Sequence, residues 1–405
     1  MVAGIRGRLG LGGIAVVAGA LMVACHPVRA PAKDPVELTD AAPGGSPQDI
    51  ALAEADPDEY AWRLFLFVNR QAAAGGAGQA DAARTIGRYD PDTPVVWETW
   101  ALVSGAGRTQ GGSEVFRPDG ADPGPWTALP RAPWPAKILS ANLSGGGGPP
   151  AKEIRVNQAG YEFIRARGLY GREGLQRLYA RAVALWQPKL IQFPAAAQLV
   201  KAQWLDLGPA PAPARLARYH WRRIGGHDWG LVSLHLATKD LANWVWADFE
   251  QMDQPVAAGE PSRDSATRTD HGAPAPAKGA VEGERRELTG TKWAYYRLRG
   301  VQIGFTDARG DPTRLSDSVI EAGFEHTSCM TCHARATVRF DGGALSHLRP
   351  NPFHTDDGGR PPAIADQANA DLGAPASGAF GKDGLSFLQT DFVWSIAERA
   401  QPGRR

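Results

Sequence analysis

The first amphipathic pattern along the chain starts after residue 56. Asp56 is a residue type that caps helices, and Pro57 suits the first helical position because no backbone donor is needed there. Apolar side chains then recur at intervals of three or four residues, so that they share one helical face, at Tyr60, Leu64, Phe67 and Val68. The sequence therefore predicts a helix that begins at Pro57.

Helical spacing of apolar residues returns nearer the middle of the chain. Asn157 can cap a helix that carries Tyr161, Ile164 and Leu169. A second helix is predicted behind Gly171, and its apolar positions are Leu175, Leu178, Tyr179 and Val183.

The pattern then changes to that of strands. Aromatic and β-branched residues alternate or run together in four segments, which are residues 199–207, 219–224, 231–237 and 244–249. Residues 293–305 are expected to form a further hairpin that turns at Gly300. Helical segments combined with a run of strands indicate an α+β fold, in which an antiparallel sheet is flanked by helices.

Segments rich in Gly, Pro and charged residues interrupt these elements. Residues 105–125 and 144–150 favour loops. Residues 256–290 carry almost no large apolar side chain, which indicates a disordered or surface insertion. Residues 342–384 are again loop-like, and the apolar segment 385–396 behind them is expected to form a final helix.

The N-terminus has the pattern of an export signal. Arg6 and Arg8 precede an apolar run of about sixteen residues, which is short for a membrane-spanning helix. The run ends in Met-Val-Ala-Cys at residues 22–25, which resembles the cleavage box of bacterial lipoproteins, with Met at its first position in place of Leu. The resemblance implies a lipidated Cys25, and the alternative is an ordinary leader cut near Ala30. Both place the folded protein outside the cytoplasm, in the periplasm, and the first anchors it to a membrane.

Charge and composition limit the classes of function. The formal net charge is +1, from 44 Lys and Arg against 43 Asp and Glu, so the chain lacks the general positive charge that binds nucleic acid. With 43% of its 405 residues apolar, the chain can bury a large core. Its thirteen Trp residues are expected to pack in that core or to line a large apolar ligand pocket.

The strongest chemical signal is a cysteine motif. Only three cysteines occur, and apart from Cys25 they are Cys329 and Cys332. They stand in Cys-Met-Thr-Cys-His at residues 329–333, the C-x-x-C-H pattern of covalent haem attachment. Positions i, i+3 and i+4 share one side of a helical turn, so both thiols can reach the two vinyl groups of one porphyrin edge while His333 binds the iron. The motif predicts one covalent haem c.

Three other chemistries use the same residue types. A structural zinc ion needs four ligands, yet no other Cys follows, and His347 and His354 are too far apart for a zinc-binding pair. A redox dithiol of the thioredoxin type is expected beside a β-α-β pattern, which is absent from the sequence around this motif. A simple disulfide is the third alternative.

The sequence does not identify the second axial ligand of the iron. Small electron-carrying cytochromes usually take a Met downstream of the motif, whereas the last Met here is Met330, inside the motif, where its side chain points away from the distal face. His235 is the leading candidate. Strict alternation places it on one strand face with Leu231 and Ser233, and the opposite face carries Val232, Leu234 and Leu236. The other candidates are His220, His227, His347, His354 and Met252.

The position of the motif indicates how the chain is organised. About 300 residues precede the motif, whereas in a compact cytochrome c domain it stands near the start. Ser318 and Glu321 fit the capping box of a helix that leads into the motif. The haem is therefore expected in or against a larger α+β body. The expected parts are a signal peptide at 1–25, a tether at 26–47, the body at 48–315 and a haem-attachment region at 316–405.

With its motif in place, the chain resembles the c-type cytochromes. Residues 96–100 (VWETW), 200–204 (VKAQW), 230–235 (GLVSLH) and 244–250 (WVWADFE) more loosely resemble a group of large, functionally uncharacterised bacterial cytochrome c-like exported proteins. This looser resemblance covers most of the mature chain and implies haem binding and electron transfer.

Three functions follow from these patterns. The first is electron transfer with an exported redox partner. The second is a haem enzyme of peroxidase or oxygenase type, in which an open or exchangeable distal iron position takes a small ligand. The third is an exported binding lipoprotein without haem. Nucleic acid is not an expected partner of any of them.

Overall fold

The computed structural model describes residues 43–74, 78–86, 93–103, 115–117, 120–126, 151–254, 288–305, 313, 315, 328–341, 344–346, 380–381, 384–385 and 387–399. These residues all belong to one compact unit, Glu37–Arg405. The predicted signal peptide, the tether up to residue 42, most of the insertion at 256–290 and the capping box of Ser318 and Glu321 lie outside the described residues. Within the described ranges, no helix has the length and apolar character needed to cross a bilayer.

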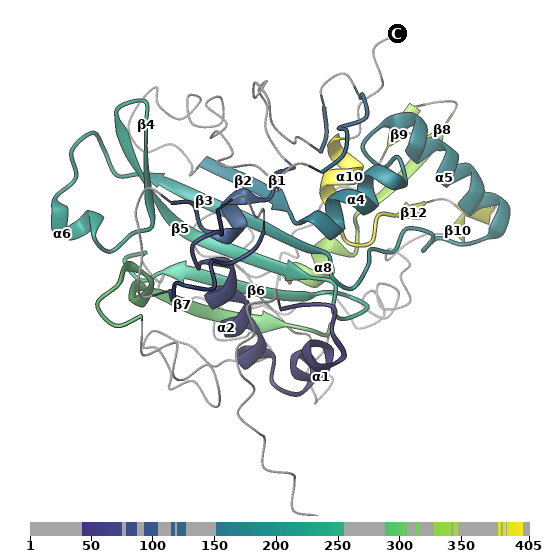
Figure 1. The fold of residues 1–405 in the computed structure, drawn as a ribbon. Coiled ribbons are helices and arrows are strands. Elements are labelled where there is room, and N and C mark those ends of the chain that lie inside the picture. The colour runs from purple at the N-terminus through teal and green to yellow at the C-terminus, as the bar shows by residue number, and fades with distance from the viewer. Residues whose placement is uncertain are drawn as a thin grey trace, which may run out of the picture. The chain divides into compact units, whose positions relative to one another are not determined.

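The fold is α+β, as the sequence predicts, and an antiparallel sheet is its central feature (Figure 1). In the described part of the chain this sheet has seven strands in the order β1-β2-β3-β5-β6-β7, and β4 pairs with β5 beside that path. The strands are β1 (Ala101–Leu102), β2 (Ala151–Val156), β3 (Gln198–Asp206), β4 (Trp221–Ile224), β5 (His227–Thr238), β6 (Val245–Gln251) and β7 (Tyr296–Gln302). The four predicted strand segments are confirmed as β3 to β6.

The predicted hairpin at residues 293–305 is wrong. Lys292–Tyr295 form a short 3-10 helix, η3, and β7 then runs without a turn through Gly300. Gly300 pairs with Asp248, and a register shift beside this pair leaves Arg299 as an extra residue. A glycine inside a strand commonly marks such a bulge, which explains why it resembled a turn signal in the sequence.

A second bulge changes which side chains share a face of β5. Two consecutive residues of β3 pair with Leu231 and Ser233, so Val232 is an extra residue. Leu231 consequently lies in the same core as the other leucines of β5. The expectation that Leu231 shares a face with His235 is therefore wrong, because alternation holds only where the register is unbroken.

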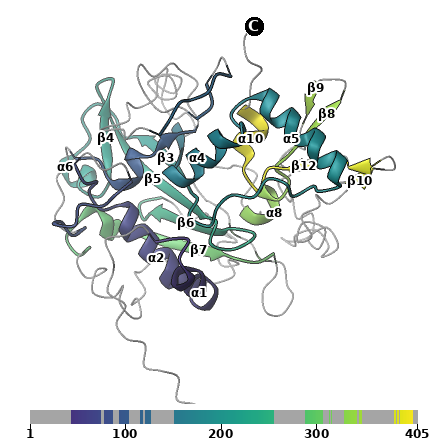
Figure 2. The same ribbon diagram turned by 45° about the vertical axis from the view of Figure 1, so that its right-hand side comes forward.

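Helices cover both faces of the sheet (Figures 1 and 2). On one side, α1 (Pro47–Ala55) and α2 (Pro57–Val68) enclose a core in which Phe65 stacks on Phe249 at 4.3 Å between ring centroids. On the other side lie α4 (Gln158–Ala166), α5 (Arg172–Leu185) and α10 (Trp394–Arg399), which pack around a second core. Two short helical segments, η1 (Val96–Thr99) and α6 (Pro213–Leu216), belong to loops.

Local capping explains where these helices begin. The Asp56 carboxylate accepts the Glu59 N–H at 3.2 Å, and the Asn157 side chain accepts the Gly160 N–H at 3.1 Å, so the predicted starts of α2 and α4 are confirmed. The predicted helix behind Gly171 is confirmed as α5.

The predicted tether does not extend to residue 47. Ser46 caps α1, with its hydroxyl accepting the Asp49 N–H at 3.0 Å, and Pro47 is already helical. The Gly45 N–H donates to Asp240 at 2.7 Å. The chain is therefore bound to the body from the residues that precede α1.

The C-terminal elements lie together beside α5 (Figure 2). They are α8 (Cys329–His333), β8 (Thr337–Asp341), β9 (Ala344–Ser346), β10 (Phe380–Gly381), β11 (Gly384–Leu385), β12 (Leu388–Gln389) and α10. The predicted helix at 385–396 is wrong in its start, because two short strands come first. Asp391 and Phe392 then have φ of 50° and 68°, a left-handed conformation that a helix does not contain, so α10 begins only at Trp394.

Candidate functional site

The cysteine motif forms a single helical turn, α8. Met330 is fully buried in the second core, whereas Cys329, Cys332 and His333 are partly exposed. The i, i+3, i+4 spacing places Cys329, Cys332 and His333 on one side of the turn, where Cys329 packs against the second core.

A glutamine from the central sheet holds this turn in place. Gln302, at the end of β7, donates from Nε2 to the Ser328 hydroxyl at 2.6 Å and to the Thr313 hydroxyl at 2.7 Å. Its Oε1 accepts the N–H of Met330 at 3.0 Å. All four residues are at most 3% exposed, so these bonds tie the motif to the sheet within the protein interior.

His333 is oriented by two contacts. Its Nδ1 lies 2.8 Å from the carbonyl oxygen of Phe392, and its ring lies 4.4 Å from the Trp246 ring, centroid to centroid. A carbonyl oxygen only accepts, so Nδ1 carries a hydrogen, and in the neutral form of the imidazole the lone pair is then on Nε2. A neutral imidazole held in this tautomer by a backbone carbonyl is the arrangement that metal-binding histidines use.

The Cys329 and Cys332 thiols are not joined to each other in a disulfide. The Cys329 thiol donates to the Leu315 carbonyl oxygen at 3.1 Å. Within the described ranges, no group of three or more His, Cys, Asp or Glu side chains is placed to hold a metal ion. The motif thus presents two thiols and one imidazole from a single turn, the donor set that covalent haem attachment requires.

Two candidate axial ligands lie far from the motif. Met252 is six residues beyond Trp246, the residue that contacts His333, which corresponds to about 20 Å along a strand. His227 is ten residues before Ala237, the strand partner of Trp246, or about 33 Å away, and it is bound to Asp206. Neither is therefore placed beside the turn.

His235 is the nearest of the described candidates along the sheet. It pairs with Asp248 on β6, and Asp248 shares a face with Trp246, two residues earlier. His235 Nδ1 lies 3.6 Å from an Asp248 carboxylate oxygen, and 18% of the His235 side chain is exposed. His235 thus lies on the face of the sheet that carries the motif, about two residues from the tryptophan that contacts His333. His347, His354 and Cys25 lie outside the described residues.

This face of the sheet is polar around His235. Ser233, Asp248 and Glu250 are at most 1% exposed, and Glu250 accepts from two arginines of β7. Gln203 on β3 is fully buried, and its amide has no hydrogen-bond partner in the part of the chain that the structure describes. Such a face is unusual beside a hydrophobic core, because buried polar groups are costly unless they are bonded.

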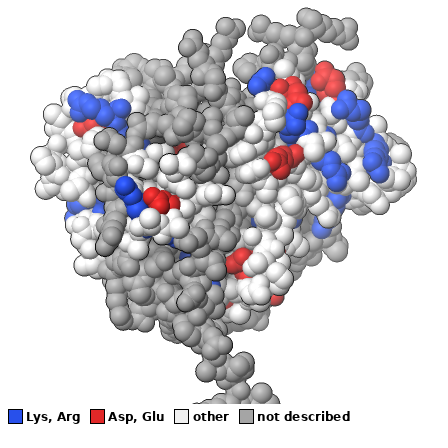
Figure 3. All heavy atoms as spheres, in the orientation of Figure 1, with Lys and Arg blue, Asp and Glu red and all other residues white. Residues whose placement is uncertain are grey.

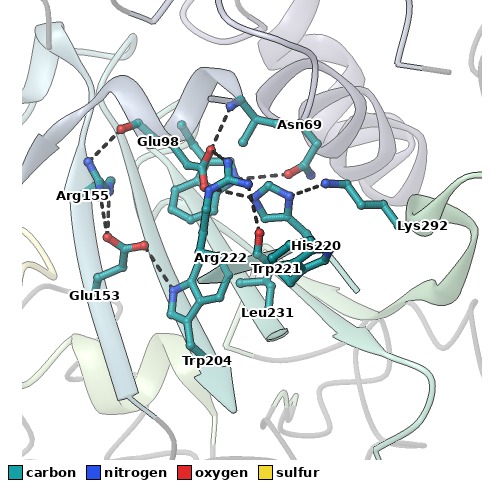
Figure 4. Close-up of polar contacts among 12 residues, drawn as sticks. Asn69, Glu98, Glu153, Arg155, Trp204, His220, Trp221, Arg222, Leu231 and Lys292 are labelled. Atoms are coloured by element: carbon teal, nitrogen blue, oxygen red, sulfur yellow. Dashed lines mark hydrogen bonds and ion pairs between the residues drawn. The ribbon is translucent and has the colours of Figure 1, made fainter. Parts of the chain in front are cut away.

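A second buried polar cluster lies at the opposite face, between η1, the start of β4 and η3 (Figure 4). Its centre is Glu98, whose carboxylate accepts from Val95 N at 2.9 Å, from His220 Nε2 at 3.0 Å and from Arg222. On the other side of the imidazole, His220 Nδ1 lies 2.6 Å from Lys292 Nζ. His220 therefore bridges a carboxylate and an amine.

The charged groups in this cluster shift one another's pKa values. Burial alone raises the pKa of Glu98, but Arg222 and His220 outweigh it and hold that pKa far below its ordinary value. Burial lowers the pKa of His220 well below its ordinary value, and Lys292 and Arg222 lower it further. Burial and the charge of Arg222 also lower the pKa of Lys292 well below its ordinary value. His220 is accordingly a neutral base at neutral pH.

A buried ion pair supports the segment that carries Glu98. Arg155 lies 2.8 Å from Glu153, and its guanidinium also donates to the carbonyl oxygens of Glu98 at 2.8 Å and Trp100 at 3.0 Å (Figure 4). Trp204 Nε1 donates to Glu153 at 3.2 Å. Burial raises the pKa of Glu153 in spite of the arginine beside it.

The sequence located the motif and missed this second cluster. Glu98 and His220 are 122 residues apart, and His220 and Lys292 are 72 residues apart, so no local spacing marks them. His220 was expected only as a minor candidate for the iron, and the structure places it in the Glu98 cluster instead. In comparisons with known proteins, no family profile, curated protein or solved structure matches the chain.

Proposed function

We propose that the chain is an exported c-type cytochrome that carries one haem, bound covalently through Cys329 and Cys332, with His333 as an iron ligand. The observation that carries this proposal is the orientation of His333, whose Nδ1–H donates to the Phe392 carbonyl, so that Nε2 is the iron-binding nitrogen of the neutral imidazole. Haem supplies a one-electron redox centre, and the chain's residues orient it.

The surroundings of the motif suit this role. Gln302 fixes the turn from the sheet side, and Trp246 packs against the His333 ring, so the imidazole is held from two directions. The buried Met330 anchors the turn in the core, while Cys329 and Cys332 are partly exposed residues. The leader supports the same proposal, because bacterial haem c is attached after export.

Electron transfer is the activity that we propose, with an exported redox protein as the partner. Helix α5 packs against β8, the strand that follows the motif in the sequence, and presents exposed Arg177 and Arg181. Basic side chains gather over this part of the surface (Figure 3). Leu185 and Trp186 at the end of α5 are 48% and 62% exposed. An apolar patch beside basic residues fits an acidic partner, and the charges speed its encounter.

A haem enzyme of peroxidase or oxygenase type is the second candidate, and the polar sheet face favours it. His235 and Asp248 form a pair on the face that carries the motif, and the unbonded Gln203 amide is nearby. A peroxide or oxygen molecule on iron needs polar groups of this kind to donate and accept protons. The two functions differ in the distal iron position, which a protein ligand occupies in the electron carrier and which is open or exchangeable in the enzyme.

For localisation, we propose the periplasm, with a membrane anchor at a lipidated Cys25. The tether up to residue 42 then links that anchor to the body at the residues that precede α1.

The test is the absorbance of the denatured protein. The chain is produced in a bacterium that matures haem c, purified and unfolded, and the pyridine spectrum of the covalent haem is recorded. We expect one haem per chain, which is lost in Cys329→Ala or Cys332→Ala. Cys25→Ala is the matched control, since it removes the third cysteine, and it should keep the haem while releasing the protein from membranes. A wild-type protein that has no haem absorbance, with both thiols titratable, contradicts the proposal.

Binding of carbon monoxide to the ferrous protein distinguishes the two proposed functions. A ferrous protein that binds carbon monoxide readily, together with a high-spin ferric form, favours the enzyme. A low-spin iron that does not bind it favours the electron carrier.

A further inference from the structure

The Glu98 cluster contains the parts of a nucleophilic amine site. Lys292, His220 and Glu98 stand in one line of contacts, in which Nζ lies 2.6 Å from His220 Nδ1 and Nε2 lies 3.0 Å from the Glu98 carboxylate (Figure 4). A nucleophile beside a base, with the base oriented by a third group, is the arrangement that activates side chains for covalent catalysis.

The protonation states follow from the partners. Glu98 is ionised, because it accepts from Val95, His220 and Arg222 at once. Nε2 of His220 must therefore carry a hydrogen, and Nδ1 has the lone pair that faces Lys292. The imidazole is thus set in the tautomer that can accept a proton from the lysine.

The cluster is held rigidly from several sides. The His220 ring stacks on Trp293 at 4.9 Å with an interplanar angle of 26°, and the His220 N–H donates to the Tyr296 hydroxyl at 3.0 Å. Lys292 Nζ also lies 5.0 Å from the centre of the Trp293 ring. His220 is fully buried and Lys292 is partly exposed.

We propose that Lys292 is a nucleophilic amine that forms imines with small aldehydes, with His220 as its base and Glu98 as the residue that positions His220. The reaction begins from the ammonium form of Lys292. His220 Nδ1 takes one proton from it, and the free Nζ attacks the carbonyl carbon. A new nitrogen–carbon bond forms and a carbinolamine results.

Dehydration completes the reaction. His220 returns its proton to the hydroxyl of the carbinolamine, the carbon–oxygen bond breaks and water leaves, so that a protonated imine remains on Lys292. The proton taken from the ammonium leaves in the water, and charge is conserved throughout. The transient imidazolium faces the Glu98 carboxylate, which stabilises it. This activity is independent of the haem.

The same environment makes the amine reactive. An ordinary lysine has a pKa of about 10.4, and each unit by which its pKa is lowered raises the neutral fraction at pH 7 about tenfold. Burial and Arg222 both lower the pKa of Lys292. An exposed lysine such as Lys189 on the loop behind α5 lacks this burial and serves as the internal reference.

Competitive labelling of the full chain tests the proposal. Purified protein is treated briefly with formaldehyde and cyanoborohydride, which trap imines as methylated lysines, and peptide mass spectrometry measures the rate at each of the nine lysines. At pH 7 we expect Lys292 to react at least about tenfold faster than Lys189. A pH series from 6 to 10 should place the midpoint of the Lys292 labelling profile below the ordinary lysine value of about 10.4.

Two variants separate catalysis from structure. His220→Gln keeps a donor toward Glu98 and an acceptor toward Lys292 but cannot take a proton, so it should slow Lys292 labelling and leave the Lys189 rate unchanged. Lys292→Arg should abolish labelling at this position alone. If Lys292 in the wild-type protein reacts no faster than Lys189 at pH 7, the proposal is wrong, and this result needs no variant to fold.

Discussion

Gln302 and Gln203 are two buried glutamines of the central sheet that differ in their hydrogen bonding. We therefore expect their substitution to change the free energy of unfolding by different amounts. Gln302 is fully buried and bonded to Ser328, Thr313 and Met330 N. Replacing it with Met keeps its approximate size and leaves the Met330 N–H buried without that acceptor. An unsatisfied buried donor costs about 1–3 kcal/mol, and each lost side-chain bond adds about 0.5–1.5 kcal/mol. Because the two hydroxyls retain other contacts, we expect Gln302→Met to lose about 2–4 kcal/mol of unfolding free energy.

Gln203 is the matched control. It is also fully buried in the sheet, but its amide has no partner in the described part of the chain. Gln203→Met therefore removes an unbonded polar group, and we expect stability within about 0.5 kcal/mol of the wild type or above it. Guanidinium unfolding followed by Trp fluorescence measures both variants. Equal losses in the two variants refute the reasoning, because hydrogen bonding is the difference between the two sites.

Three further predictions follow from single residues. Burial lowers the pKa of His220, so below about pH 6.5 the unfolded chain takes up a proton that the folded chain does not. The free energy of unfolding should therefore fall between pH 7.5 and pH 5. Denaturant unfolding across this range should show a smaller fall in His220→Gln. If His235 is the second axial ligand, His235→Ala should convert a low-spin iron to high-spin with the haem still attached, and an unchanged spectrum eliminates it. Gly174→Ala should lower the free energy of unfolding by about 1–3 kcal/mol although Ala favours helices, because its Cβ would lie 1.9 Å from the Gly168 carbonyl oxygen. Ala180→Gly, on the exposed face of α5, should lower it by only about 1 kcal/mol. Thermal unfolding measures both variants.

The parts of the fold that the sequence predicts are those whose signals are local. Asp56 and Asn157 mark helix starts because a cap and the backbone N–H that it accepts are three residues apart. The strands are visible from the alternation of their side chains. The motif at residues 329–333 is found for the same reason, since all three reactive groups lie within five residues.

The errors arise where distant segments decide the structure. The bulges at Val232 and Arg299 depend on how neighbouring strands pair, and no feature of one strand reveals the register of the next. The Glu98 cluster is assembled by the sheet from three separate segments, which explains why His220 alone gave no functional signal. For the site, sequence predicts which groups attach the haem, whereas their orientation depends on partners such as Phe392, 59 residues beyond His333.

The bond between His333 and the Phe392 carbonyl has a consequence for the order of maturation. If the chain is exported as proposed, the cysteines reach the periplasm before the residues around Phe392 do. Thioether formation needs only the motif, whereas the imidazole gains its supporting carbonyl after the C-terminal turn has folded onto the body, where Asp391 binds Lys239 and the Phe193 N–H. A chain truncated before residue 387 is therefore expected to keep its covalent haem while the iron ligation becomes heterogeneous. In the proposed cytochrome, attachment of the cofactor and fixation of its histidine ligand would thus be separate steps, and the C-terminal residues from 387 would be needed only for the second.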